Sequence, residues 1–275
     1  MPNEFNHCAR VLVLRSFVLP ERTSFPIIII AAFISFLFVI YKYKLIIMKF
    51  TSTLINGKLI KRYKRFFVDI EENNKTLTAH CPNTGSMMGL LNKGNTVWLT
   101  KNSDPKRKLK FTLEMIKVKK RIIGVNTHRA NRIVEHGLQN KLIKEFKEIN
   151  NIKPEFKYSD DTRFDFLCDN KILEVKNVTL LRNDNVAEFP DAVTSRGSKH
   201  LKKLINSIKK GYKPYVLFLT QIQGINNFRI AKDIDSNYFI NYIEAKKAGV
   251  NFLAYRCKLN SKEIKIEKKI KILNV

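Results

Sequence analysis

The sequence predicts two successive domains, a small β-barrel and then an α/β domain. Short runs of alternating apolar and polar residues, separated by turn residues, fill the chain from Met48 to about Lys120. The apolar spacing becomes helical after Asn126, and a continuous apolar run follows at Val216–Thr220. Short strands with regular turns are typical of small barrels, and helices that alternate with buried strands are typical of α/β layers. We therefore place the barrel at residues 48–122 and the α/β domain at 123–275.

Five alternating runs supply the strands of the predicted barrel. They are Thr53–Leu59, Arg65–Ile70, Thr76–Cys81, Thr96–Thr100 and Leu109–Val118. Five strands of this length fit an OB-like barrel. Such barrels commonly bind single-stranded or distorted nucleic acid through a basic face that carries aromatic side chains.

A basic and aromatic segment of the barrel is the first candidate for nucleic-acid binding. It consists of Arg62, Tyr63, Lys64 and Arg65, followed by Phe66. The alternative is that Tyr63 and Phe66 belong to the core and that the basic side chains are only solvated.

The loop His80–Met87 is the second candidate in the barrel, because small polar residues surround a proline and a glycine there. Hydroxyl and backbone N–H groups of such a loop can bind a phosphate. The residues assigned to this role are Asn83, Thr84 and Ser86. A structural turn at the barrel rim is the ordinary alternative.

The α/β domain is predicted to begin with a helix. Asn126 or Thr127 can cap it, and apolar residues from Ala130 to Phe146 follow helical spacing. The later elements, in order, are a helix that ends at Gly211, the strand Val216–Thr220, a helix at Asp235–Ala248 capped by Gly249, a strand at Asn251–Cys257 and an edge strand at Glu263–Leu273.

Between the first two of these helices, residues 163–176 predict a β-hairpin. Two strictly alternating runs are joined by Asp169-Asn170, a pair suited to a two-residue turn. Counting outward from that turn places Asp165 opposite Glu174, and Arg163 opposite Lys176. The side chains predicted to point to the other face, into a core, are Phe164, Phe166, Leu173 and Val175.

Asp165 and Glu174 are candidate metal ligands, because like charges opposite each other on a sheet repel unless a cation lies between them. Two carboxylates suit Mg²⁺ (or Mn²⁺), which prefers oxygen ligands and keeps several waters. A bound metal can polarise a phosphodiester, and Lys176 on the same face can orient the attacking water. Glu135, at the margin of the first helix's apolar stripe, can face the same site. The alternative is a solvated strand face with salt bridges worth about 0–1 kcal/mol each.

The helix after the hairpin begins with basic residues, and a helix start favours anions because it offers free N–H groups. Arg196, Lys199 and His200 are therefore candidates for binding a phosphate, as is Arg163 on the hairpin. A solvated first turn is the alternative.

The formal net charge is +27, from 51 Lys+Arg and 24 Asp+Glu. A protein this basic attracts polyanions, and we favour nucleic acid because the charge is spread through segments that otherwise read as globular core. Two alternatives stay open. An AT-rich genome would itself produce 37 lysines against 14 arginines, and a basic surface also suits anionic membranes. The charge supports phosphate contacts and says nothing about sequence readout.

Residues 1–47 form an apolar amino-terminal extension. Its uncharged stretch Phe25–Tyr41 is at the short end for a membrane span, and it lacks the small-residue cleavage site of a signal peptide. We favour a start at Met48, because everything from there reads as a self-contained soluble protein. The widely spaced Cys8, Cys81, Cys168 and Cys257 predict neither disulfides nor a zinc framework, which fits the cytoplasm. Membrane anchorage is the alternative if the extension is genuine.

Several longer motifs cover nearly all of Met48–Val275 and none of the first 47 residues. They are RYKRF, HCPNTGSMMGL, GVNTHRAN, RFDFL, LEVKNVTL, FPDAVTSRGSKHL and GVNFLAYRC. Together they resemble the bacterial sugar fermentation stimulation protein (SfsA) family, whose members begin close to where Met48 stands. The resemblance implies an OB-like domain followed by a domain similar to PD-(D/E)XK nucleases. It also implies DNA binding with little sequence preference and a role in regulating maltose metabolism genes.

By position, Asp165, Glu174 and Lys176 match the nuclease core, with Glu135 as an extra acid. Phe164 stands where the nuclease signature has proline. The leading hypothesis is therefore a DNA-binding protein with a Mg²⁺-dependent nuclease site. The alternative is a non-catalytic DNA-binding regulator of sugar metabolism whose acidic site is vestigial, and a membrane-attached protein is the third.

Overall fold

The computed structural model describes residues 49–50 and 52–273. The predicted apolar extension at 1–47 and the predicted start at Met48 lie outside this range. Within the described residues, no helix combines the length and the apolar character that a membrane crossing requires.

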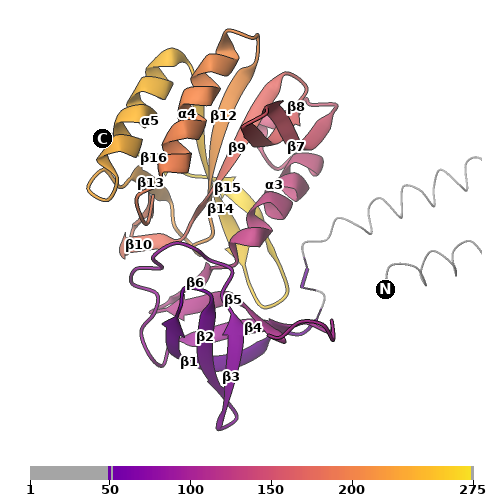
Figure 1. The fold of residues 1–275 in the computed structure, drawn as a ribbon, viewed down its shortest axis with the longest axis vertical. Helices are drawn as coiled ribbons and strands as arrows, with labels where there is room; N and C mark the ends of the chain where they lie inside the picture. The colour runs from indigo at the N-terminus through magenta and orange to yellow at the C-terminus, as the bar shows by residue number, and fades with distance from the viewer. Residues whose placement is uncertain (1–48, 51, 274–275) are drawn as a thin grey trace, which may run out of the picture. The chain divides into compact units, whose positions relative to one another are not determined.

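The first domain is a closed barrel, drawn in indigo to magenta in Figure 1. Its strands are β1 (Ile55–Tyr63), β2 (Phe67–Glu72), β3 (Lys75–His80), β4 (Thr96–Lys101), β5 (Phe111–Val118) and β6 (Arg121–Gly124). They lie in the order β3-β2-β1-β4-β5-β6, and an additional β3–β5 pairing closes five of them. The predicted OB-like barrel is confirmed. Alternating side chains such as Leu59, Val68 and Leu99 are fully buried inside it.

The second domain is built on two mixed sheets. Its elements are η1 (Thr127–Arg129), α3 (Ala130–Gln139), η2 (Lys144–Phe146), β7 (Ile152–Ser159), β8 (Thr162–Cys168), β9 (Lys171–Val178), β10 (Leu180–Asn183), β11 (Val186–Phe189), α4 (Ser195–Ile208), β12 (Lys213–Thr220), β13 (Asn227–Ile230), α5 (Ser236–Ala248), β14 (Asn251–Leu259), β15 (Ile264–Lys269) and β16 (Lys271–Ile272). The larger sheet has the order β15-β14-β12-β9-β8-β7, with β9, β12 and β14 parallel, and the smaller has the order β10-β11-β13-β16.

Helices cover both faces of the larger sheet (Figure 1). On one face, Leu201 and Leu204 of α4 share a core with Val216 and Phe218 of β12. On the other face, Ile133 and other residues of α3 pack with the alternate residues of the same strands. The central strand β12 is therefore buried on both sides, as its apolar run predicts.

The first predicted helix is shorter than its apolar spacing indicates. It ends at Gln139, Lys141 has a left-handed backbone with φ 56°, and the Leu142 N–H bonds back to the Gly137 carbonyl at 2.8 Å. Ile143 and Phe146 are still fully buried. The apolar residues after Gln139 are therefore part of the core although they are no longer in the helix.

The barrel and the α/β domain are joined by backbone pairing. The Gly124 N–H donates to the Gln221 carbonyl at 2.8 Å, and the Gln223 N–H donates to the Ile122 carbonyl at 2.9 Å. Barrel residues such as Leu59 belong to the same hydrophobic cluster as the α4 side of the larger sheet. The two domains are therefore joined by main-chain hydrogen bonds and by a shared hydrophobic cluster.

Candidate metal and nucleic-acid site

The predicted hairpin turn is confirmed. Cys168 pairs with Lys171 across it, and the ladder continues through Phe166 and Leu173. Asp169 takes the left-handed conformation with φ 51°. Its carboxylate accepts backbone N–H groups of residues 150 and 151 at 3.2 and 3.0 Å, which ties the turn to the chain before β7.

The ladder between β8 and β9 ends at Phe166–Leu173, so the predicted pairs Asp165–Glu174 and Arg163–Lys176 are absent from it. On the other edge of β8, Arg163 pairs with Lys157 of β7. The Asp165 carboxylate accepts the Val175 backbone N–H at 2.7 Å. A side chain has thus taken the place of a main-chain partner, because the two strands diverge at this point.

The four apolar side chains of the hairpin are all buried, but they do not share one face as predicted. Phe166, Leu173 and Val175 pack on the α3 side, whereas Phe164 packs on the α4 side. The Phe164 ring lies 5.8 Å from the ring of His200, edge to face. The side of the sheet on which the apolar residues of β8 pack changes at Asp165. In β7, between the residues that pair with Phe164 and Phe166, Glu155 has a left-handed backbone with φ 52°.

Asp165 lies between the two helical layers and interacts with the second acid. The Asn131 side-chain amide of α3 donates to its carboxylate at 2.7 Å. Burial, followed by the negative charge of Glu174, raises the pKa of Asp165 to about 6, against the hydrogen bonds from Val175 and Asn131. The two carboxylates are therefore close enough to repel each other.

Glu174 is only 4% exposed. Its Oε1 atom accepts the Lys176 ammonium at 2.7 Å and lies 2.6 Å from Nδ1 of His200. Its Oε2 atom is buried without a hydrogen-bond partner among the described residues. Burial alone would raise the pKa of Glu174, but Lys176 and His200 lower it below its usual value. Asp165, Glu174 and Lys176 are called the acidic site from here on.

Two residues of this neighbourhood were not predicted to belong to it. Asn131, which holds Asp165, lies one turn before Glu135 on α3, so helical spacing alone could have found it. The Tyr238 hydroxyl of α5 is buried without a partner among the described residues, and its pKa is raised well above the usual value by burial and by the charge of Glu174. Only the tertiary packing brings Tyr238 here. Glu135 itself is half-buried and accepts a 3.4 Å hydrogen bond from Gln139.

The donor atoms of the acidic site fit a magnesium-like ion. No group of three or more His, Cys, Asp and Glu side chains in the described part of the chain is placed to hold a metal, so the protein would offer two carboxylates. Mg²⁺ commonly binds through one or two carboxylates and keeps waters or phosphate oxygens in its other positions. The buried, unpartnered Oε2 of Glu174 is an oxygen that a cation would satisfy.

The basic candidates near the hairpin differ in their surroundings. Arg196 is exposed, and Lys199 is exposed with an ion pair to Asp161 at 3.1 Å. Arg163 is exposed, 3.9 Å from the Glu155 carboxylate. His200 is buried at 7% exposure, and its ring contacts the Glu174 carboxylate. It therefore positions this carboxylate and is not on the surface where a phosphate would bind.

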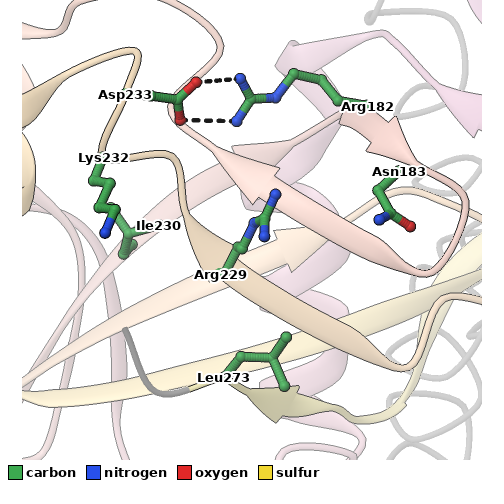
Figure 2. A pocket seen from close by; sticks show the side chains of 7 residues that line it. All are labelled: Arg182, Asn183, Arg229, Ile230, Lys232, Asp233 and Leu273. Atoms are coloured by element: carbon green, nitrogen blue, oxygen red, sulfur yellow. Dashed lines mark hydrogen bonds and ion pairs between the residues drawn. The ribbon is translucent and has the colours of Figure 1, made fainter.

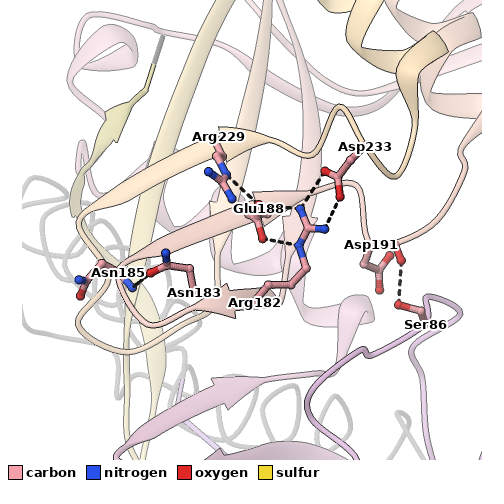
Figure 3. A network of polar contacts seen from close by, with 8 residues as sticks. All are labelled: Ser86, Arg182, Asn183, Asn185, Glu188, Asp191, Arg229 and Asp233. Carbon is pink, nitrogen blue, oxygen red and sulfur yellow. Dashed lines mark hydrogen bonds and ion pairs between the residues drawn. The ribbon is translucent and has the colours of Figure 1, made fainter. Parts of the chain in front are cut away.

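Arg62 holds the barrel loop together. Its guanidinium donates to the carbonyls of Arg65 at 2.8 Å, Asn83 at 2.6 Å, Gly85 at 3.0 Å and Ser86 at 3.3 Å. Asn83 is buried, and the Ser86 hydroxyl donates to the Asp191 carbonyl at 2.7 Å (Figure 3). Many hydrogen-bonding groups of this loop therefore bond to other groups of the protein and are not free to bind a phosphate.

The other barrel candidates are partly or wholly exposed. Tyr63 stacks on Phe67 at 5.5 Å between ring centroids and donates to Asp69 at 3.2 Å. Lys64, Arg65 and Thr84 are exposed.

A basic cavity of about 620 Å³ lies beside the smaller sheet (Figure 2). Its lining residues are Arg182, Asn183, Arg229, Ile230, Lys232, Asp233 and Leu273. A second cavity, of about 570 Å³, is also lined by Arg182, together with barrel residues such as Lys119 and Lys120.

Two of the arginines that line the first cavity converge on one buried acid. The Arg182 guanidinium donates to Glu188 at 2.7 and 2.8 Å and also binds Asp233. The Nε atom of Arg229 donates to Glu188 at 2.8 Å (Figure 3). Glu188 has no exposed side-chain surface, and both of its oxygens are satisfied.

Comparison with known proteins gives consistent matches over both domains. A sequence profile described as "SfsA N-terminal OB domain" matches residues 60–125, and one described as "Sugar fermentation stimulation protein RE domain" matches residues 128–263. The chain is 65% identical over 231 residues to the sugar fermentation stimulation protein homolog of Pelagibacter ubique (strain HTCC1062), covering 82% of this chain and 100% of the relative. It is 40% identical over 234 residues to the homolog of Marinomonas sp. (strain MWYL1), covering 82% and 91%.

A solved structure, that of Pyrococcus furiosus SfsA in complex with Ca²⁺, has a similar fold. It matches with a TM-score of 0.75 at 22% sequence identity. The match covers 83% of this chain and 99% of that chain. The two-domain architecture therefore exists in an independently solved protein.

Proposed function

The chain belongs to the sugar fermentation stimulation protein (SfsA) family, and from this premise we propose that it binds DNA with little sequence preference and hydrolyses phosphodiester bonds with a divalent metal ion. The observation that carries the proposal is the state of Glu174. A carboxylate 4% exposed, with one oxygen unpartnered among the described residues, lies close enough to Asp165 to raise the pKa of that second acid. Such perturbed pairs are typical of functional sites.

Asp165 and Glu174 would hold the metal ion, Mg²⁺ or Mn²⁺. When bound, the ion would polarise the phosphodiester and neutralise the charge that develops on the leaving oxygen. The Pyrococcus protein was solved as a complex with Ca²⁺. Since Ca²⁺ and Mg²⁺ both prefer oxygen ligands, this supports a site for a hard cation in the family.

The residues of the chain itself set the geometry of the acidic site. Asn131 and the Val175 N–H fix the Asp165 carboxylate. Lys176 and His200 both occupy Oε1 of Glu174, which leaves Oε2 free to face a cation. The Lys176 side chain is 13% exposed, and its ammonium group can hold a proton beside the attacking water and stabilise negative charge on the phosphate.

DNA binding would depend on phosphate contacts, since the net charge of +27 is the strongest compositional feature of the chain. Arg196 and Lys199, near the start of α4, are exposed, and α4 also carries His200, which touches Glu174. These two cations are therefore well placed to hold a strand near the acidic site. We place the protein in the cytoplasm, since Cys81, Cys168 and Cys257 are free thiols.

The test is a nuclease assay on single-stranded, duplex and branched DNA with Mg²⁺ or Mn²⁺, and with a chelator. We compare the wild type with Glu174→Ala and with Asp160→Asn, a fully exposed acid of the neighbouring β7–β8 turn. We expect metal-dependent cleavage by the wild type and by Asp160→Asn, and a loss of at least about 10²–10³-fold in Glu174→Ala. Metal-independent DNA binding with no cleavage of any of these substrates would contradict the nuclease proposal and favour a non-catalytic regulator.

A further inference from the structure

We infer that an unpaired DNA strand reaches the acidic site by stacking its bases along three aromatic rings, those of Phe66, His80 and His128, which we call the ring track. This inference rests on the proposed function and narrows its substrate to DNA that contains unpaired bases.

The three rings lie in a row although they come from three separate segments. Phe66 follows the turn after β1, His80 is the last residue of β3, and His128 belongs to η1 of the other domain. The ring centroids of Phe66 and His80 are 6.5 Å apart with planes inclined by 21°, and those of His80 and His128 are 6.4 Å apart with planes inclined by 44°. Both distances are within the range of interacting aromatic pairs.

The ring track faces solvent at both ends. Phe66 is 43% exposed, one of only five large apolar side chains that are exposed in the described part of the chain. His128 is exposed and His80 is half-buried. Lys64 and Arg65 both have left-handed backbones, with φ 47° and 60°, which is uncommon for residues with side chains and often occurs at binding sites. Phe66, at the end of this turn, therefore points to solvent and not into the barrel core.

Hydrogen bonds hold the three segments in place. Arg62 bonds the Arg65 carbonyl and also the loop carbonyls at 83–86. The Cys81 N–H donates to the Phe66 carbonyl at 2.8 Å, and the Thr127 hydroxyl donates to the Pro82 carbonyl at 2.6 Å. The rings therefore do not need to be assembled when a ligand arrives, which reduces the entropic cost of binding.

The ring track leads toward the acidic site. His128 precedes Asn131 by three residues, about one turn of helix, and the Asn131 amide bonds directly to Asp165. Two exposed cations are close to the ring track in sequence: Arg65 directly precedes Phe66, and Arg132 follows His128 by four residues. Arg107 is close enough to His80 to help lower the pKa of that imidazole, after the larger effect of burial.

The chemistry of this surface selects unpaired bases. Every base has a flat π-face that can stack on an aromatic side chain, whatever the sequence, and nearby cations hold the phosphates between bases. In a duplex these faces are covered by neighbouring base pairs, so a row of exposed rings gains little from it. A strand end, a flap or a single-stranded region would gain most.

The test measures binding without cleavage, in the presence of a chelator, with a fluorescent oligo(dT) of about 12 nucleotides. An abasic strand of equal length carries the same phosphates without bases, and a duplex of equal length is the third probe. The variants are Phe66→Ala, His128→Ala and the control Ile240→Ala, which removes an exposed apolar side chain from α5. Since Phe66 and His128 are exposed, neither change should prevent folding.

We expect Phe66→Ala and His128→Ala each to weaken oligo(dT) binding by about 5- to 150-fold, the loss of one stacked base. Binding of the abasic strand and the duplex should change less than about twofold, and Ile240→Ala should resemble the wild type. Equal losses for all three probes, or no loss for oligo(dT), would overturn the inference. The assay measures binding and not cleavage, so its result can be interpreted even if the protein proves not to be a nuclease.

Discussion

Two buried glutamates, one in each sheet of the α/β domain, show how similar residues can serve different purposes. Glu174 of β9 and Glu188 of β11 are 4% and 1% exposed, and each contacts two basic side chains. Both oxygens of Glu188 accept hydrogen bonds from arginines (Figure 3). In Glu174 both contacts converge on Oε1, and Oε2 has no partner among the described residues.

The difference indicates which glutamate is structural. A buried carboxylate with all its hydrogen bonds made has no capacity left for a ligand, and its role is to hold β10, β11 and β13 together. Glu174, by contrast, has a buried oxygen, Oε2, with capacity left for a ligand, and a bound cation would also relieve its repulsion with Asp165.

The largest effect on stability should come from the structural glutamate. Glu188→Gln removes the ion pair of Arg229 with Glu188 and leaves Arg182 with Asp233 as its charged partner. We expect it to lower the free energy of unfolding by about 3 kcal/mol, the lower end for a broken buried pair because both guanidiniums are partly exposed and Arg182 keeps one partner. Glu174→Gln should change it by less than about 1 kcal/mol, because it also removes a repulsion with Asp165. Urea unfolding measures both. Equal losses would remove the distinction between the two acids.

Asp165→Asn should stabilise the metal-free protein above about pH 6. The pKa of Asp165 is raised from 3.8 to about 6 in the folded state. The folded protein therefore holds a proton that the unfolded chain has lost, and stability falls as the pH rises through this window. We expect a gain of about 2 kcal/mol at pH 8 and none below about pH 4. Urea unfolding in chelator at both pH values measures it, and an equal effect at both would contradict the raised pKa.

Arg229→Ala should be milder than Glu188→Gln. Arg182 still donates to both oxygens of Glu188, and the Arg229 side chain is 44% exposed, so solvent screens its contribution. We expect a loss of about 1 kcal/mol in the free energy of unfolding. A loss as large as that of Glu188→Gln would mean that the two arginines act as one unit.

The smallest effect on stability should come from Arg196, which is exposed on α4. Arg196→Ala should leave the free energy of unfolding within about 0.5 kcal/mol. If Arg196 contacts a phosphate, the slope of log affinity for DNA against log salt should fall by about one, because one fewer counterion is released. Binding measured at several salt concentrations gives this slope, and an unchanged slope would place the phosphate contacts elsewhere.

Local patterns predicted much of the fold. Turn residues and strict alternation placed the hairpin turn at Asp169-Asn170, and the strand Val216–Thr220 lies within the central strand β12. The strands β6, β7, β10, β11 and β13 were not predicted, because their own patterns are weak. The pairing partners of β13 are also distant in sequence. The tail at Glu263–Leu273 was predicted as one edge strand, but it divides into β15 and β16, which join different sheets.

The sequence predicted which residues form the acidic site, but not how they are arranged. Alternation placed Asp165 and Glu174 near each other, yet it assumed that the ladder continues past Phe166. The strands diverge after this pair, and the Asp165 carboxylate bonds to the Val175 N–H there. No spacing rule contains this tertiary arrangement. The burial of His200 against Glu174 and the internal role of Arg62 likewise depend on packing.

Binding of Mn²⁺ to the chain tests the central claim most directly, without requiring any substrate. Titration calorimetry would compare the wild type with Glu174→Gln and with Asp160→Asn as the matched surface control. We predict that the wild type and Asp160→Asn bind Mn²⁺ with equal affinity and release it to excess Mg²⁺, while Glu174→Gln binds at least about tenfold more weakly. Equal binding by Glu174→Gln and the wild type, or no binding by the wild type, would contradict a metal site at these two carboxylates.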